Sequence, residues 1–277
     1  MSAPGRWSEL SSSVAGLSFR HTARPGAGVP LLCIHGVGPG TTGQANFNPL
    51  LARLPESVPI HLIDLIGFGG SARKPAQPGF DVALWLDQID AALDQIGGPA
   101  ILVGNSVGGA LALKAAARRD DLQAVLALGA AAAGAATAEL KAFWRAPRDR
   151  DALAAAMAPM NGARSPPSPQ LVAERWAAFA DPDYARWFDE TLADPEACLS
   201  AAALTADEAA KIGAPLRILH GMLDRACPPA PLAELVIRRL PRADLTLLGG
   251  CGHNVIAERT AEVVAAINQL TNGKPNI

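Results

Sequence analysis

Short apolar runs alternate along the chain with longer segments in which alanine and leucine recur at helical spacing. The runs are typical of β-strands buried on both faces, and we expect six of them, at residues 30–35, 60–65, 100–105, 124–129, 216–221 and 243–249. The longer segments predict helices at 82–96, 107–118, 231–240 and 261–270. This alternation predicts an α/β fold with a mainly parallel sheet, to which residues 14–21 would add an antiparallel edge strand.

The pattern changes between residues 134 and 210, where helical stretches continue without a convincing strand. We therefore predict a first core part at 1–133, a helical lid at 134–210 and a second core part at 211–277. The predicted lid holds over half of the aromatic residues: Phe143, Trp144, Trp176, Phe179, Tyr184, Trp187 and Phe188. We interpret the segment as a lid over a substrate pocket; the alternative is that these residues only attach it to the core.

Composition narrows the classes of partner. The 277 residues are 49% hydrophobic, enough for a sizeable core, and a formal net charge of -2 argues against nucleic acid or an anionic membrane as partner. Residues 1–21 lack the basic and apolar regions of a secretory signal. Since the four cysteines form no CxxC pair, we expect a cytoplasmic protein with reduced, buried thiols at Cys33, Cys198, Cys227 and Cys251.

The segment GNSVG, at residues 104–108, joins a predicted strand to a predicted helix and fits the pattern G-x-S-x-G. A serine on such a turn is lifted clear of the sheet, and bulky side chains two positions away on either side would clash. Gly104 and Gly108 remove that clash. The pattern indicates Ser106 as the nucleophile of a serine hydrolase.

A serine hydroxyl needs a base to take its proton and a carboxylate to orient that base. In a fold of this kind we expect both to follow later strands, in the chain order serine, acid, histidine. Asp224 follows the predicted strand at 216–221, and His253 follows the one at 243–249. We predict that these two residues complete a catalytic triad with Ser106.

The remaining histidines and one further aspartate are interpreted as structural. His21, His61 and His220 lie within or at the ends of predicted strands, and His35 is expected to brace a loop. Asp64 also ends a strand, but it precedes the serine in the chain, so we interpret it as fixing a turn.

The oxyanion of a tetrahedral intermediate needs two fixed N–H donors. The backbone N–H of Val107, at the start of the helix after Ser106, is one candidate, and that of Val37 in the loop HGVGPG is the other. Because nucleophile, base and donors would all come from the chain, the sequence implies neither a metal nor an organic cofactor.

Five segments resemble the α/β-hydrolase superfamily: HGVGPGTTGQAN (35–46), DLIGFGGS (64–71), GNSVGG (104–109), ILHGMLDRACP (218–228) and GCGHNV (250–255). Within it, the HGxGPG loop and the asparagine before the serine resemble the meta-cleavage-product hydrolases. Members of that family hydrolyse a carbon–carbon bond in ring-fission products of aromatic degradation. The resemblance implies an α/β-hydrolase fold: a mostly parallel eight-stranded sheet, flanking helices and an inserted helical lid.

The resemblance also implies a substrate site. Asn46 and Asn105 match asparagines that, with an arginine of the lid matched by Arg175, hold the dienoate end of the family's substrates. An arginine can bind a carboxylate through two hydrogen bonds, and asparagine amides can donate to a developing enolate oxygen. Two alternatives stay open: Asn105 could brace the serine turn, and Arg175 could be an exposed charge on a lid helix.

One departure from the family concerns the residue after the predicted catalytic histidine. The family usually has tryptophan there, whereas this chain has Asn254. The change replaces an apolar wall of the pocket with a polar group, and Asn254 is therefore a candidate substrate-binding residue.

The leading hypothesis is a serine hydrolase that cleaves the carbon–carbon bond of a 2-hydroxy-6-oxo-dienoate. The alternative is a small carboxylesterase or lactonase using the same triad, because one oxyanion geometry serves esters and ketones. A non-catalytic receptor is a third possibility, whereas a haloalkane dehalogenase is disfavoured because its nucleophile would be a carboxylate. The expected partner is a small-molecule substrate, and the sequence leaves a homodimer open.

Overall fold

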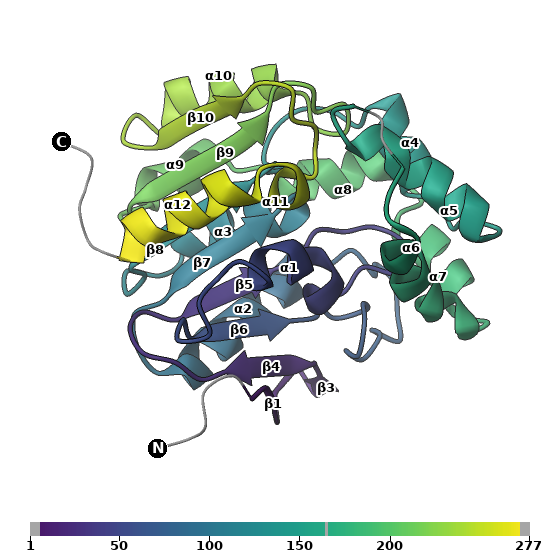
Figure 1. The fold of residues 1–277 in the computed structure, drawn as a ribbon, viewed down its shortest axis with the longest axis horizontal. Coiled ribbons are helices and arrows are strands. Elements are labelled where there is room, and N and C mark those ends of the chain that lie inside the picture. Colours follow the sequence, from purple (N-terminus) through teal and green to yellow (C-terminus); the bar gives the residue numbers. More distant parts are fainter. Residues whose placement is uncertain (1–5, 164–165, 272–277) are drawn as a thin grey trace.

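All six predicted apolar runs form strands. In the computed structural model, which describes residues 6–163 and 166–271, they are β5 (Leu31–Ile34), β6 (Ile60–Ile63), β7 (Ile101–Asn105), β8 (Ala124–Leu128), β9 (Leu216–Gly221) and β10 (Asp244–Leu248). They pair in parallel in the order β6-β5-β7-β8-β9-β10 (Figure 1). Residues 1–5, within the segment searched for a secretory signal, lie outside the described part.

The antiparallel edge lies elsewhere than predicted. The expected strand at 14–21 is wrong, because Ala15 and Gly16 both adopt positive φ, at 49° and 78°, and turn the chain back. β2 (Ser13–Val14) and β3 (Leu17–Ser18) therefore pair only with each other. The sheet is completed by β4 (His21–Arg24), antiparallel to β6, and by β1 (Ser8–Leu10), antiparallel to β4, which gives eight strands.

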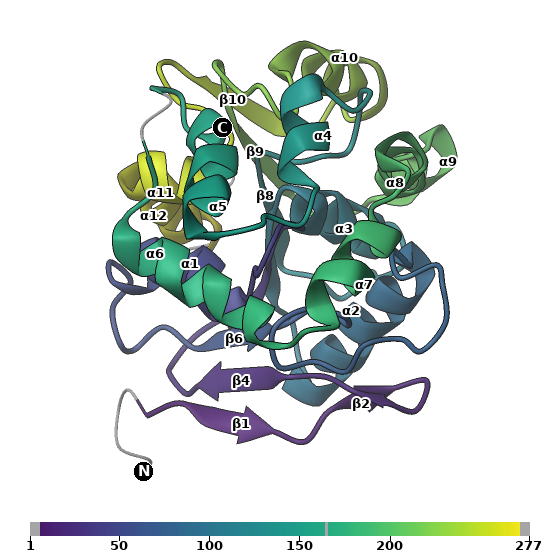
Figure 2. The ribbon, with the colours of Figure 1, turned by 90° about the vertical axis from the view of Figure 1, so that its right-hand side faces the viewer.

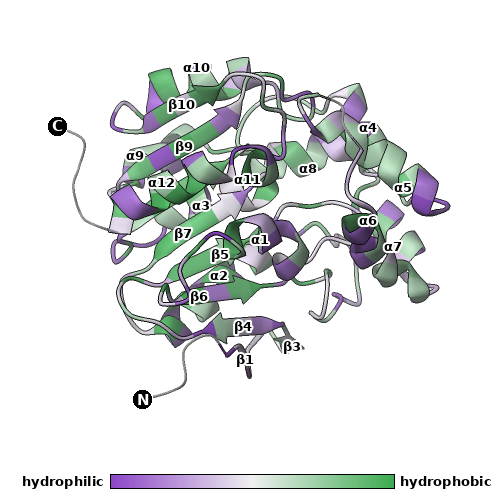
Figure 3. Cartoon of the chain, viewed as in Figure 1, coloured by the Kyte–Doolittle hydropathy of each residue, from purple (hydrophilic) through white to green (hydrophobic). Residues whose placement is uncertain are grey.

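Helices cover both faces of the sheet. One face carries α1 (Gly43–Leu51), α11 (Val255–Glu258) and α12 (Thr260–Thr271), and the other carries α2 (Val82–Ile96), α3 (Val107–Ala116) and α10 (Pro229–Arg239). Successive strand residues point to opposite faces, so Leu31 and Cys33 join one core cluster while Leu32 and Ile34 join the other. The central strands are accordingly hydrophobic over most of their length (Figure 3).

The four predicted helices are all present, and α2 has the predicted bounds. Its start is fixed by Asp81, whose side chain accepts a hydrogen bond from the backbone N–H of Leu84, and its end by Gly97 in the left-handed conformation. By contrast, β10 is not buried on both faces as its apolar sequence predicted. It forms the edge of the sheet, and Leu247 is 41% exposed there.

The chain between β8 and β9 forms α4 (Ala138–Phe143), α5 (Arg150–Met157), α6 (Pro169–Trp176), α7 (Tyr184–Thr191), α8 (Pro195–Ala202) and α9 (Ala206–Lys211), with short 3-10 turns after α5 and α6. Figure 2 shows α4 to α7 grouped in front of the strands, whereas α8 and α9 pack on α3. Within the described part of this segment there is no strand. Its division from the core at residues 134 and 210 stays a prediction, and residues 164–165 lie outside the described part.

Several aromatic residues of this segment attach it to the core. Trp187 stacks edge-on against Phe68 at 5.4 Å between ring centroids, and Tyr184 and Phe188 are buried beside it. Phe143 instead lines a cavity at Ser106. The attachment role thus accounts for part of this set, and whether the segment acts as a lid stays a prediction.

The cysteine prediction is confirmed in its structural part, since all four cysteines are buried and free of disulfide bonds. Among the described residues, no helix is both long enough and apolar enough to cross a membrane.

Candidate active site

Ser106 occupies the strained turn between β7 and α3. It has a φ of 56° and a ψ of -120°, a conformation that side-chain-bearing residues rarely adopt. A Cβ atom on Gly104 would lie 2.2 Å from the carbonyl oxygen of Gly108, and one on Gly108 would lie 2.2 Å from that of Ile34. The steric reason for both glycines is therefore confirmed.

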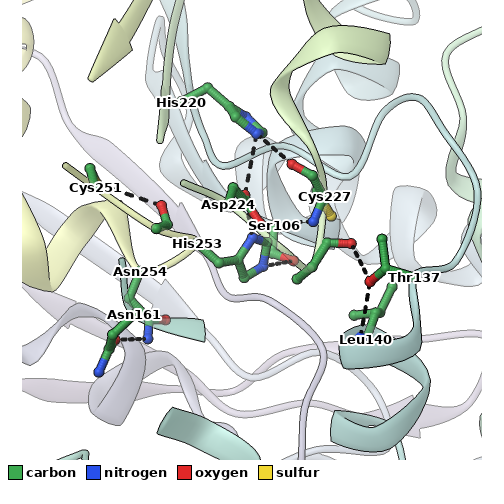
Figure 4. Close-up of polar contacts among 12 residues, drawn as sticks. Ser106, Thr137, Leu140, Asn161, His220, Asp224, Cys227, Cys251, His253 and Asn254 are labelled. Carbon is green, nitrogen blue, oxygen red and sulfur yellow. Dashed lines mark hydrogen bonds and ion pairs between the residues drawn. The ribbon is translucent and has the colours of Figure 1, made fainter. Parts of the chain in front are cut away.

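Two loops bring His253 and Asp224 to this serine. The Nε2 atom of His253 lies 2.8 Å from the Oγ of Ser106, and its Nδ1 lies 2.7 Å from the Oδ2 of Asp224 (Figure 4). Since a carboxylate only accepts hydrogen bonds, Nδ1 carries the proton and Nε2 can accept from the serine hydroxyl. The three side chains predicted from sequence thus meet in the geometry of a nucleophile, a base and an orienting acid.

The electrostatics of the three groups support proton transfer. Burial alone would raise the pKa of Asp224, but His253 and His220 beside it hold that pKa well below its usual range. Burial also opposes a charge on His253, yet the Asp224 carboxylate outweighs it and raises the pKa of His253 above the ordinary value. An ionised acid beside a strengthened base is the arrangement that general-base catalysis requires.

His220 is a neighbour of the acid that sequence reasoning took only as structural. Its Nε2 atom lies 2.7 Å from the carbonyl oxygen of Cys227 and 3.2 Å from the Oδ2 of Asp224. Both partners are acceptors, so Nε2 carries the proton and donates to them. The backbone N–H of Cys227 donates to the other carboxylate oxygen at 2.8 Å. These bonds fix the rotamer of Asp224. The position of His220 within the strand sequence ILHG did not indicate its contact with the acid.

The proposed oxyanion donors, Val37 and Val107, come from two different segments near Ser106. Val107 is the first residue of α3, a position whose N–H has no acceptor within the helix. Val37 lines the small cavity at Ser106, and its backbone carbonyl accepts a hydrogen bond of 3.0 Å from the Nε1 of Trp144. The N–H of Gly40 in the same loop donates to the hydroxyl of Tyr184 at 3.0 Å. The inserted helices therefore hold this loop, which the sequence did not indicate.

A hydrogen bond between the side chains of Asn46 and Asn105 fixes the orientation of both amide groups. The Oδ1 atom of Asn46 accepts from the backbone N–H of Gly36 and from the Nδ2 of Asn105, both at 3.1 Å. Because the Gly36 N–H can only donate, these roles are assigned, and the Oδ1 of Asn105 must point elsewhere. It is buried and meets no donor among the residues that the structure describes. Asn105 was expected to donate to the substrate. Its Nδ2 gives one of two N–H groups to Asn46, and its Oδ1 is in addition an acceptor without a partner among the described residues.

Arg175 is a buried cation on α6. The backbone of α6 packs closely on Gly40, because a Cβ atom added to Gly40 would lie 1.8 Å from the Arg175 carbonyl oxygen. This packing places the Arg175 side chain in the protein interior. Burial lowers the pKa of Arg175 to about 10, so it remains charged at neutral pH. Its Nε and Nη1 atoms find no acceptor within residues 6–163 and 166–271. A buried charge without a partner is costly, which indicates a site for an anion. The alternative of an exposed charge is wrong, since Arg175 is 7% exposed.

Asn254 begins α11 directly after His253. Its Nδ2 atom donates to the Oδ1 of Asn161 at 2.6 Å, as Figure 4 shows. Asn254 is half-buried and lines two cavities. One, of about 20 Å³, contains Ser106 and His253, and the other, of about 360 Å³, lies beside it.

His35, Asp64, His21 and His61, which were interpreted as structural, all make hydrogen bonds within the chain. His35 accepts a hydrogen bond from the N–H of Leu65 and bonds the carbonyl of Gly36, so it braces the loop as predicted. Asp64 accepts from the backbone N–H of Gly43 and of Gly70. His21 and His61 bond each other at 2.9 Å, on the strands β4 and β6 far along the sheet from the serine turn.

Comparison with known proteins adds to this geometry. Residues 31–267 match the sequence profile described as "Alpha/beta hydrolase family". The chain belongs to this family. It is a hydrolase, and the eight-stranded sheet and the serine turn are those expected of an alpha/beta hydrolase.

Among curated alpha/beta hydrolases, a 2-hydroxymuconate semialdehyde hydrolase of Pseudomonas sp. (strain CF600) is 27% identical over 98% of this chain and 96% of its own. A pimeloyl-[acyl-carrier protein] methyl ester esterase of Shewanella woodyi is 38% identical, but over only 36% of this chain and 35% of its own. The solved structure of a meta-cleavage product hydrolase mutant from Pseudomonas fluorescens, complexed with acetates, is 25% identical with a TM-score of 0.84, covering 93% and 95% of the two chains.

Proposed function

We propose that this hydrolase cleaves the carbon–carbon bond next to the ketone of a 2-hydroxy-6-oxo-dienoate. The observation that carries the proposal is Arg175, a buried cation that meets no anion among the described residues and lines the same small cavity as Ser106. A neutral ester does not need such a charge, whereas the carboxylate of a dienoate would compensate it. The similarity to a 2-hydroxymuconate semialdehyde hydrolase along nearly the whole chain supports the same reaction class.

The acid portion of the substrate would lie on the side of Arg175, Asn46 and Asn105. The guanidinium binds the carboxylate, and the unpaired Oδ1 of Asn105 accepts from the 2-hydroxyl group. Loss of that hydroxyl proton accompanies ketonisation of the dienol, with a proton added to the chain carbon next to the ketone. Ketonisation makes that carbon a viable leaving group, because the electron pair can then return to the 2-oxo oxygen.

Ser106 then attacks the ketone carbon, and His253 takes the hydroxyl proton while Asp224 keeps its imidazole oriented. The backbone N–H groups of Val37 and Val107 stabilise the oxyanion. When the tetrahedral intermediate collapses, the carbon–carbon bond breaks and its electron pair returns to the 2-oxo oxygen. His253 gives its proton to this leaving group, which departs as the hydroxydienoate, and His253 is neutral again. Water, deprotonated by His253, attacks the acyl-serine, and His253 returns the proton to Ser106 as the second acid leaves.

A carboxylesterase or lactonase using the same three residues is the second candidate. The polar Asn254 beside the catalytic histidine and the local similarity to a methyl ester esterase favour it. Such an enzyme would hydrolyse neutral esters by the same acyl-serine steps, and Arg175 would then contribute little to catalysis.

The variant Arg175→Ala separates the two candidates. We expect its kcat/KM for an acetyl-ended dienoate to fall by about 100-fold or more, because a two-bond contact to a carboxylate is lost. Hydrolysis of p-nitrophenyl acetate should change by less than about threefold, since a neutral ester does not use the charge.

The matched control is Arg186→Ala, which removes an arginine of α7 that is exposed and paired with Asp183. It should leave both rates unchanged. Equal losses on dienoate and ester in Arg175→Ala would contradict a carboxylate-binding role and favour the esterase.

A further inference from the structure

The two cavities at the site are unequal in size, and only the smaller one borders Ser106. The small one, about 20 Å³, contains Ser106 and is bordered by Phe143 and Met160, which are 7% and 1% exposed. The other, about 360 Å³, borders neither of these two side chains nor Ser106. Hydrophobic side chains therefore border the cavity that contains the reacting serine, while most of the available volume lies in the cavity that does not border it.

The two cavities share four polar residues, Asn46, Asn105, Arg175 and Asn254. These are the side chains to which the proposed function assigns the acid portion of the substrate. The large cavity therefore continues from the carboxylate-binding side and leads away from the acyl side. Asn254 lines both cavities, and its Nδ2 donates to Asn161, which lines the large one.

The large cavity is bounded by α1, α6 and α11, and its wall is mixed in character. Met157, Leu171 and Ile256 contribute apolar surface, while Asn48 and Gln170 contribute amides. Amides both donate and accept hydrogen bonds, so they suit neutral hydroxyl or carbonyl groups. Glu174 also lines the cavity and would repel a second carboxylate placed there.

The volume of the large cavity is greater than the simplest acid portion of a substrate would fill. At about 30 Å³ for each water molecule, the cavity has room for roughly a dozen water-sized groups. An unsubstituted five-carbon hydroxydienoate has fewer non-hydrogen atoms, and its carboxylate is already held at Arg175.

We propose that the site selects a substrate with a small acyl group, formyl or acetyl, and an acid portion extended by a neutral hydrogen-bonding substituent that occupies the large cavity. The inference rests on the proposed function for the orientation of the substrate. It assigns selectivity for the acyl group to Phe143 and Met160, and selectivity for the acid portion to the space beside Ala257 and Leu171.

The first test compares wild-type kcat/KM along two substrate series. In one, the acid portion is constant and the acyl group changes from acetyl to benzoyl, for which we expect a fall of about tenfold or more. In the other, the acetyl group is constant and a hydroxyalkyl chain is added to the acid portion, for which we expect kcat/KM to hold or rise. Tolerance of benzoyl together with a loss on extension would overturn the inference.

The second test fills the large cavity. Ala257 is exposed and lines that cavity but not the small one, so Ala257→Trp should lower the ratio of kcat/KM, extended over unextended substrate, by about tenfold. The control Ala173→Trp adds the same ring to an exposed position of α6 that lines neither cavity, and it should keep the wild-type ratio. Equal losses on both substrates in Ala257→Trp would indicate an entrance only and would overturn the inference.

Ester substrates separate failure of this inference from failure of the proposed function. If wild type cleaves no dienoate but prefers p-nitrophenyl acetate over p-nitrophenyl benzoate and tolerates extended alcohols, the proposed function fails and the size selectivity stands. If wild type cleaves dienoates with the opposite size preference, the inference fails and the proposed function stands.

Discussion

The indole Nε1 of Trp144 donates a hydrogen bond of 3.0 Å to the backbone carbonyl of Val37. Trp144 ends α4 and is 1% exposed, so this bond is shielded from water. It links the inserted helices to the loop whose N–H group is proposed to stabilise the oxyanion. The carbonyl belongs to the peptide unit that follows the Val37 N–H, so the indole holds the backbone next to the proposed donor from a position more than 100 residues away in the chain.

The variant Trp144→Phe tests this link. It keeps an aromatic ring but leaves the buried Val37 carbonyl without its donor, which should lower stability by about 1–3 kcal/mol. Because the oxyanion forms with every substrate, kcat should fall by about tenfold for dienoate and ester alike, with little change in KM.

The matched control is Trp176→Phe, which changes a half-buried tryptophan stacked on Phe179. It should leave kcat near the wild-type value. A change confined to KM in Trp144→Phe would argue that the indole shapes the pocket and does not position the oxyanion donor.

The strain at Ser106 predicts opposite effects on activity and stability. Ser106→Ala should lower kcat by about 10⁴-fold or more, as expected when a serine nucleophile is removed. Ser106→Gly should be as inactive but more stable than Ser106→Ala by about 1 kcal/mol, because only glycine adopts a φ of 56° without strain. Thermal unfolding of the two variants checks this, and equal melting temperatures would show that the turn stores no strain.

The pH dependence of kcat/KM should report the raised pKa of His253. The base must be neutral to accept the serine proton, so activity is lost as the pH falls through this pKa. Since the Asp224 carboxylate raises it above the ordinary 6.5, the acid limb should have its midpoint above pH 6.5. A midpoint at or below 6.5 would mean that Asp224 does not strengthen the base in the free enzyme.

The meeting of Ser106, Asp224 and His253 could be predicted from the sequence. Each follows a strand with an apolar pattern, and the carboxyl ends of parallel strands lie at one edge of the sheet, so position in the chain sufficed. The helix α2 could be predicted for a similar local reason, because its capping residues Asp81 and Gly97 flank a periodic apolar segment.

The features that were missed depend on contacts between distant segments. The turn at Ala15 splits what looks like one strand, and short polar strands carry no pattern that gives their pairing. The hydrogen bond that leaves the buried Oδ1 of Asn105 unpaired runs from the Asn105 Nδ2 to Asn46, 59 residues earlier. The burial of Arg175 comes from the packing of α6 on Gly40, and a helix sequence alone gives no sign of it.

The most direct test of the proposed reaction is the kcat/KM of the purified wild-type protein for an acetyl-ended 2-hydroxy-6-oxo-dienoate, measured beside p-nitrophenyl acetate. Loss of the dienoate's visible absorbance follows the first reaction, and release of acetate identifies the bond that breaks. We predict a value at least about 100-fold higher for the dienoate, because only that substrate engages Arg175. A higher value for the ester, or no acetate released from the dienoate, would contradict carbon–carbon hydrolysis.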